Sequence, residues 1–353
     1  MNRRSFLTTA GALAASNEAA ATGAADPPPR KVIVGTVMQP FWEKYPGPPK
    51  RLAQLTGLVD QLAEQAAKKC GRGPDLVVLP ETAVTGEAGG DAAAVAVSLE
   101  GELKDAFASA ARRHRCYIVA PTYLLEPGTR RAYNVGILFG RKGEVAGIYR
   151  KVHLAVSPGR DSMEGGSTPG KEVPVFDCDF GKLGIQICFD MEFDKGWDEL
   201  ARKGAGLIAW PTQSPQTAHP AARAMRRRCY IVSSTWRNNA SIFEPTGKIV
   251  AAIRPPERTL VEELDLSYVI LPWSSKLRKG ELLRERYGDR VGFRYYEDED
   301  CGIFWSNDPK LPIRQMVRAE GLADADELLA QARALYRKSG VPGYGEVYQR
   351  KNR

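Results

Sequence analysis

Three apolar segments of this 353-residue chain each lead directly to a side chain with chemistry of its own: a carboxylate, an amine and a thiol. Glu81 follows the run Asp75-Leu-Val-Val-Leu-Pro80, Lys151 closes a segment that begins at Glu144, and Cys188 ends the segment 180–188. Apolar runs of this length fit buried strands. Because side chains at strand ends converge on one crevice of a layered α/β domain, the sequence predicts that these three groups meet.

Alternating strand and helix patterns support a layered α/β domain. Further segments extend the pattern, with strands predicted over 31–37, 116–121, 134–138, 144–149, 207–210, 229–235 and 241–244, and helices over 50–69, 103–115, 197–203 and 218–228. From about residue 273 the pattern changes to a charged loop (284–300), an aromatic segment (302–305) and a helix (324–338). We expect this extension to wrap a neighbouring subunit or to cover the pocket.

The trio suffices to attack a carbon–nitrogen bond. A thiol is a strong nucleophile only as a thiolate, so Cys188 needs a cation to lower its pKa or a base to take its proton. Lys151 can do the first and Glu81 the second. Lys151 and the backbone N–H of Phe189 can hold the oxyanion, and Glu81, once protonated, can protonate the leaving amine.

The segments around these residues resemble the nitrilase, or carbon–nitrogen hydrolase, superfamily. The matching motifs are Pro-Glu-Thr-Ala-Val-Thr-Gly at Glu81, Tyr-Arg-Lys-Val-His-Leu at Lys151 and Gly-Ile-Gln-Ile-Cys-Phe-Asp at Cys188. The likeness covers about residues 31–272, includes Tyr133-Asn134, and is specific because the three motifs occur in order. It implies an αββα sandwich, a Glu-Lys-Cys triad and a thioester intermediate. The resemblance fades from about residue 273, so we expect a C-terminal extension over 273–353. The predicted reaction requires no cofactor.

The resemblance also suggests a second active-site glutamate between the lysine and the cysteine. Glu164 is the nearest match, with an ordinary loop carboxylate as the alternative. We further predict substrate contact for Tyr149, two residues before the lysine. Glu192, four residues after the cysteine, is predicted to lie at the mouth of the crevice and attract cations, or instead to pair with Lys195 on the surface.

Departures from the family's motifs guide the choice of substrate. Nitrilases proper usually have Trp-Glu after the cysteine, whereas Phe189-Asp190 follows here, and Met191-Glu192 stands where relatives that hydrolyse N-carbamoyl amino acids tend to carry arginines. We therefore expect a hydrolase of a small linear amide or N-carbamoyl compound. The alternatives are a nitrilase and a non-catalytic binding or assembly protein of the same fold.

Composition argues against several other classes of protein. The net charge is +8, but acidic residues are interspersed and no aromatic-basic ladder occurs, so no nucleic-acid partner is expected. The cluster Arg226-Arg-Arg228 is interpreted as a solvated helix face or a contact with substrate or partner. Three histidines and six cysteines without zinc-type spacing predict no metal site, and the thiols are expected to be mostly reduced and buried. No run in the sequence approaches the ~20 apolar residues of a membrane helix, so we do not expect stable membrane insertion.

The first 25 residues resemble a twin-arginine export signal. Asn2-Arg-Arg-Ser-Phe-Leu7 supplies the charged start, and a mildly apolar stretch rich in small residues follows. The alternative is a disordered basic tail. We therefore predict an exported, periplasmic protein, which we expect to form a homo-oligomer.

Overall fold

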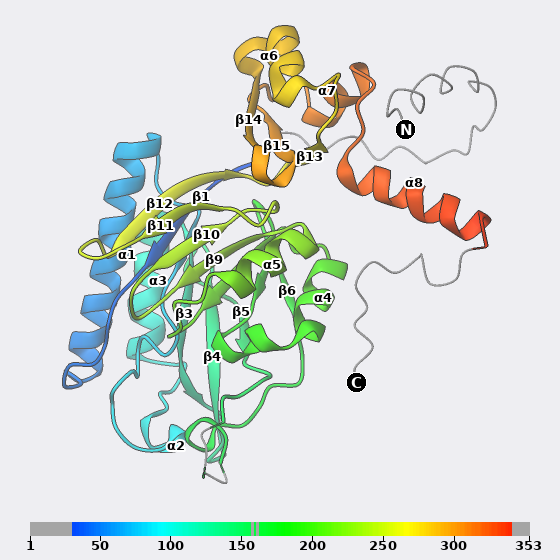
Figure 1. Cartoon of the computed structure of the whole chain (residues 1–353). Helices are drawn as coiled ribbons and strands as arrows, with labels where there is room; N and C mark the ends of the chain where they lie inside the picture. Colours follow the sequence, from blue (N-terminus) through cyan, green and yellow to red (C-terminus); the bar gives the residue numbers. More distant parts are fainter. Residues whose placement is uncertain (1–29, 157–158, 160–161, 341–353) are drawn as a thin grey trace.

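Two six-stranded mixed sheets pack face to face in this computed structural model, which describes residues 30–156, 159 and 162–340 (Figure 1). The predicted export signal, residues 1–25, lies outside the described residues. Buried side chains from both sheets form the central apolar layer, among them Val34, Val119 and Leu138 from the first sheet and Ile185 and Val232 from the second.

The first sheet has the strand order β12-β1-β2-β3-β4-β5. Strands β1, β2 and β3 run parallel, whereas β12 is antiparallel to β1 and the β3–β4 and β4–β5 pairs are antiparallel. As a result, β5 runs in the same direction as β2 and ends at the same edge of the sheet. The strands are β1 (Lys31–Val37), β2 (Leu76–Val78), β3 (Tyr117–Leu125), β4 (Ala132–Phe139), β5 (Val145–Arg150) and β12 (Thr259–Asp265).

The second sheet has the order β11-β10-β9-β8-β7-β6, with β7, β8 and β9 parallel. The strands are β6 (Val175–Cys178), β7 (Gly181–Ile185), β8 (Leu207–Pro211), β9 (Tyr230–Ser234), β10 (Ala240–Phe243) and β11 (Ile249–Ile253). The predicted strand ending at Cys188 is therefore too long, because Cys188 belongs to the short 3-10 helix η2 (Cys188–Glu192).

Helices cover the outer face of each sheet. On the first sheet, α1 (Pro48–Cys70) and α3 (Glu102–His114) bury leucines and alanines against the strands, while the short α2 (Ala92–Val95) lies nearby. On the second sheet, α4 (Asp194–Arg202) and α5 (Ala218–Arg227) pack through Trp197, Leu200 and Ala224. The four layers are the predicted αββα sandwich.

Local chemistry sets the ends of α1. Prolines occupy its first turn, where a missing backbone N–H costs no helical hydrogen bond. Gly71 ends it with φ +75°, a left-handed conformation that favours glycine, and its N–H donates to Ala67 O. These signals explain why the sequence predicted this helix to within two residues at each end.

A third sheet, of order β13-β15-β14, joins the C-terminal extension to the preceding domain, because β13 (Tyr268–Pro272) precedes residue 273. The extension has an apolar core that includes β13. Its own elements are α6 (Glu281–Tyr287), β14 (Val291–Tyr296), β15 (Cys301–Ser306), α7 (Ile313–Ala319) and α8 (Ala325–Lys338). The charged loop predicted over 284–300 is wrong, because β14 lies inside it. The segment can form a strand despite its charged residues because Arg294 is paired with Glu244, a fully buried carboxylate 2.7 Å away.

Ion pairs also change the interpretation of the arginine cluster on α5. Arg227 is 7% exposed and pairs with Asp194 and Asp198, while Arg228 pairs with Asp326 on α8. The predicted solvated helix face is therefore wrong for these two residues.

α8 itself extends away from the sandwich (Figure 1). Among the described residues, no helix is both long and apolar enough to span a membrane.

Candidate active site

The ends of three strands bring Glu81, Lys151 and Cys188 together, as the sequence predicts. Glu81 lies in the loop after β2, and Lys151 follows the last residue of β5 directly. Cys188 begins η2, three residues past the end of β7 on the facing sheet. The predicted crevice therefore corresponds to the place where the two sheets face each other, with Glu81 and Lys151 following strands of one sheet and Cys188 following a strand of the other.

Lys151 connects two carboxylates inside this crevice. Its Nζ lies 2.8 Å from Glu81 Oε1 and 2.8 Å from Glu164 Oε2, and its side chain is only 1% exposed. A buried ammonium is stable only when it is paired and hydrogen-bonded, and two carboxylates satisfy that need. The structure thus places Glu164 beside the trio.

Asn134 is a member of the cluster that sequence reasoning did not assign. Its Nδ2 donates to Glu81 Oε1 at 3.0 Å and also to Glu164 Oε1. The side chain is fully buried on β4. It therefore fixes the spacing of the two carboxylates on either side of Lys151. The signal was present in the Tyr133-Asn134 pair before the lysine, but nothing in the sequence indicated that this amide faces the crevice.

The thiol of Cys188 lies within hydrogen-bonding reach of Glu81 and Thr212. Burial raises its pKa to about 12, a rise that Glu81 reinforces and Lys151 opposes. Near neutral pH the thiol is therefore protonated, and Lys151 does not by itself produce a thiolate. Cys188 needs a base, and Glu81 is within reach.

The two charged partners differ in how burial acts on them. Burial raises the pKa of Glu81, while Lys151 beside it opposes the rise. Burial lowers the pKa of Lys151, but Glu81, Cys188 and Glu164 outweigh it and hold that pKa well above its ordinary value. Lys151 thus stays charged, and the carboxyl of Glu81 titrates closer to neutrality, as acid–base catalysis requires.

Backbone strain is concentrated at the same place. Cys188, Glu164 and Thr82, the residue after Glu81, have φ values of +43°, +44° and +50°. Left-handed backbone is costly for residues other than glycine and persists only where surrounding contacts enforce it. The strained turns hold the thiol and the two carboxylates in fixed directions.

Asp190 holds the turn that carries Cys188. Its carboxylate is fully buried and accepts hydrogen bonds from Ile187 N (2.9 Å), His153 N (2.9 Å) and the Tyr149 hydroxyl (2.7 Å). Tyr149 is itself fully buried in the layer between the sheets. The predicted substrate contact of Tyr149 stays a prediction, and the contact that the structure gives it is with Asp190.

Three buried indoles hold the backbone of the site. Trp236 Nε1 donates to Glu81 O (2.8 Å), Trp210 Nε1 to Cys188 O (3.2 Å) and Trp197 Nε1 to Asp190 O (2.9 Å). Glu81 lies in a loop, whereas Cys188 and Asp190 lie on η2, so the indoles hold two of the segments that carry the site. Sequence patterns do not reveal the contacts of Trp236 and Trp210, because these two tryptophans lie 155 and 22 residues from the carbonyls they bind, whereas Trp197 is seven residues from Asp190.

Phe189 and Glu192, the other predicted residues, lie on η2. Phe189 is its second residue, so its N–H is among those that no hydrogen bond of the 3-10 helix uses. Glu192 is exposed, and its Oε1 lies 3.4 Å from His219 Nδ1 and 3.4 Å from Gln216 Nε2. The substrate contact of Glu192 stays a prediction.

Within the described ranges, no three His, Cys, Asp or Glu side chains gather as metal ligands.

All six cysteines lie in the described part of the chain and are free thiols. Cys116 and Cys229 are buried, whereas the other four are partly exposed. Burial raises the pKa of Cys116, Cys178 and Cys229 to about 12, as it does for Cys188. What distinguishes Cys188 is therefore its contact with Glu81, not its pKa.

Sequence comparison gives matches over most of the sandwich. The Carbon-nitrogen hydrolase family model matches residues 42–271. Omega-amidase NIT2 of Danio rerio is 26% identical over 239 residues, which cover 62% of this chain and 84% of that protein. Deaminated glutathione amidase of Homo sapiens is 30% identical over 164 residues, which cover 40% of this chain and 50% of that protein.

Solved structures agree with the architecture. Nit3 of Saccharomyces cerevisiae, a member of branch 10 of the nitrilase superfamily, aligns with a TM-score of 0.57 and 24% identity, over 67% of this chain and 90% of that one. An amidase of the nitrilase superfamily from Nesterenkonia AN1 aligns with a TM-score of 0.54 and 19% identity, over 66% of this chain and 90% of that one. The predicted αββα sandwich is confirmed.

Proposed function

This chain belongs to the carbon–nitrogen hydrolase family, and we propose that it hydrolyses a small linear amide or N-carbamoyl compound through a thioester on Cys188. The omega-amidase and deaminated glutathione amidase relatives support amide hydrolysis. The observation that carries the proposal is the buried contact of Glu81 with both Lys151 and the Cys188 thiol.

In the first half of the reaction, Cys188 Sγ attacks the carbonyl carbon while its proton passes to Glu81. The Lys151 ammonium and the Phe189 N–H hold the oxyanion. When the intermediate collapses, the C–N bond breaks and the amine or ammonia leaves with the proton from Glu81. The acyl group remains on sulfur as a thioester.

In the second half, Glu81 removes a proton from water, which attacks the thioester carbon. The carboxylic acid leaves and the thiol regains its proton. Throughout the cycle Glu164 keeps Lys151 charged and in place, since its carboxylate lies 2.8 Å from the ammonium. Asn134 and Asp190 act as positioning residues, because each holds a group of the site through hydrogen bonds.

We also propose that the chain is exported and works as a homo-oligomer. The twin-arginine pattern of residues 1–25 supports export. Exposed apolar side chains support association, since surfaces of this kind mark protein contacts when they are contiguous. Met225 of α5 and Leu328 and Leu329 of α8 form one such surface, since all three are exposed and line the same hollow.

Ammonia or amine release over a panel of amides, N-carbamoyl compounds and nitriles tests the substrate class. The Cys188→Ala variant serves as the control for each compound. We expect turnover of one or more linear amides or carbamoyl compounds that vanishes in the variant. Turnover of nitriles alone, or turnover that survives in Cys188→Ala, contradicts the proposal.

A further inference from the structure

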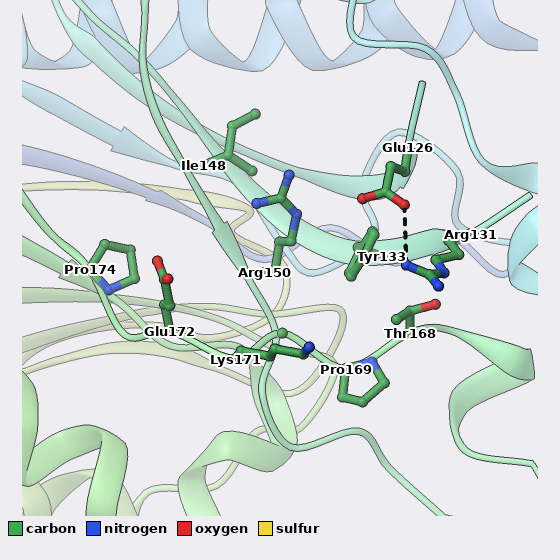
Figure 2. Close-up of a pocket in the computed structure, with 11 residues that line it drawn as sticks. Glu126, Arg131, Tyr133, Ile148, Arg150, Thr168, Pro169, Lys171, Glu172 and Pro174 are labelled. Carbon is green, nitrogen blue, oxygen red and sulfur yellow. Dashed lines mark ion pairs between the residues drawn. The ribbon is translucent and has the colours of Figure 1, made fainter. Parts of the chain in front are cut away.

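We infer that a cavity on the outer face of β4 and β5 is a binding site for a small organic monocarboxylate, separate from the active site. The cavity has a volume of about 620 Å³ and is lined by both strands and by the segment 168–174 (Figure 2). Side chains alternate between the faces of a sheet. Asn134 and Lys151 face the active site, so Tyr133 and Arg150 face the cavity behind it.

Two cationic side chains that line this cavity, Arg150 and Lys171, are available to bind an anionic ligand. Within the part of the chain that the structure describes, neither Arg150 nor Lys171 pairs with a carboxylate, whereas Arg131 Nη1 lies 3.8 Å from Glu126 Oε2. The guanidinium carbon of Arg150 lies 5.1 Å from the ring centre of Tyr133. Such a contact holds the flat guanidinium over the ring and leaves its N–H edge free for carboxylate oxygens.

The charge of the lining selects for a single negative charge. Three cations (Arg131, Arg150 and Lys171) and two carboxylates (Glu126 and Glu172) give 3 − 2 = +1. Glu172 forms no ion pair among the described residues, so it repels a second negative charge on a ligand. Inorganic phosphate, which near neutral pH is a mixture of monovalent and divalent ions, fits this balance less well than a carboxylate, which carries a single negative charge.

Apolar side chains supply a surface for the body of the ligand. Tyr133, Ile148, Pro169 and Pro174 line the cavity together with the charged groups. Figure 2 shows them around the space that the charged side chains border. Sites for small molecules combine apolar walls with a few polar groups that fix orientation. The lining therefore suits an acid with an aromatic or aliphatic body.

The floor of the cavity is the backbone that positions Lys151. Gly170 N donates to Lys151 O at 2.8 Å, and Thr168 N donates to Ala132 O at 2.7 Å. A Cβ at Gly170 would lie 2.2 Å from Arg150 O, so only glycine allows the loop to approach the strand this closely. A bound acid thus rests against the same peptide groups that hold the lysine, on the opposite side of the strand.

Isothermal titration with sodium benzoate and, separately, with inorganic phosphate tests the site. The variants are Arg150→Gln and Lys171→Gln, and the matched control is Arg130→Gln. Arg130 is exposed in the turn between β3 and β4 and does not line the cavity, so its loss removes the same charge nearby. We expect wild type and control to bind one benzoate with similar affinity and each cavity variant to bind at least about tenfold more weakly.

Three results would overturn the inference: no benzoate binding to the wild type, equal binding by wild type and Lys171→Gln, or tighter binding of phosphate than of benzoate. Benzoate held in the active site would give the second result, since that crevice lacks Lys171. Lys171 is exposed and makes no ion pair among the described residues, so Lys171→Gln decides the matter even if Arg150→Gln fails to fold. The titration does not depend on turnover and stands apart from the proposed reaction.

Discussion

The hydroxyl of Tyr149 donates to Asp190 Oδ2 at 2.7 Å and thereby joins the strand that leads to Lys151 to the turn that carries Cys188. Both side chains are fully buried, so neither group can exchange this hydrogen bond for water. The contact sets the relative position of the amine and the thiol across the two sheets.

Replacing Tyr149 with phenylalanine should therefore destabilise the protein and slow turnover. Loss of a hydrogen bond to a buried charged group costs about 1–3 kcal/mol. Urea unfolding measures the cost, and Tyr295→Phe is the matched control because the hydroxyl of Tyr295 is buried without a hydrogen-bond partner. Equal unfolding free energies for the two variants would show that the Tyr149–Asp190 contact does not matter.

Asn134→Leu should move the acid limb of the kcat/KM profile to higher pH. Asn134 donates to the Glu81 carboxylate and so favours its charged form. Without the amide, the already raised pKa of Glu81 rises further, and the base is lost at a higher pH as the solution is acidified. Asn307→Leu, a change at an exposed amide of the C-terminal extension, is the control. An acid limb at the same pH in Asn134→Leu and wild type would remove Asn134 from this role.

Cys229 should make the protein less stable in alkali. Burial raises its pKa from 9.0 to about 12. Below pH 9 both the folded and unfolded states keep the proton, so the full stability is present. Between pH 9 and about 12 only the unfolded state loses it, and the free energy of unfolding falls by about 1.4 kcal/mol per pH unit for this group.

Cys229→Ala and Cys229→Ser should both show a shallower loss over that range. The cavity or hydroxyl that they introduce shifts the whole curve without changing its slope. Unfolding free energies from urea titrations at several pH values between 8 and 11 provide the comparison. Parallel curves for wild type and both variants would contradict the raised pKa of the thiol.

Export is tested independently of the chemistry. Replacing Arg3 and Arg4 with lysines should leave the precursor in the cytoplasm, because the twin-arginine pathway reads that pair. Cell fractionation locates the protein, with the unaltered chain as the control. A variant still found in the periplasm would mean that residues 1–25 are not a signal of this kind.

The sequence predicts much of the sandwich because apolar periodicity and punctuating residues act locally. The helix over 50–69 and the strand over 31–37 both lie where the structure has α1 and β1. Glu81, Lys151 and Cys188 could be identified because each sits in its own motif at the end of a strand. The strand predicted to reach Cys188 ended early because a strained turn, not continued pairing, presents the thiol.

Features that depend on distant contacts could not be predicted. The alternation of β4 indicates that Tyr133 and Asn134 face opposite sides, but only the packing of the two sheets shows which side holds the carboxylates. Likewise, the sequence around Arg294 predicts a charged loop, because the pairing of Arg294 with Glu244, fifty residues earlier, is visible only in the structure. The contacts of Trp236 with Glu81 O and of Trp210 with Cys188 O also depend on residues far apart in the sequence.

The most direct test of the central claim is to trap the acyl-enzyme. A linear amide found by the panel is mixed with enzyme, the reaction is quenched in acid during turnover, and intact mass spectrometry with peptide mapping locates any adduct. We expect a mass increase equal to the acyl group less one hydrogen, on the peptide that contains Cys188 and absent from Cys188→Ala. An adduct on another residue, or full turnover by Cys188→Ala, would contradict the thioester mechanism.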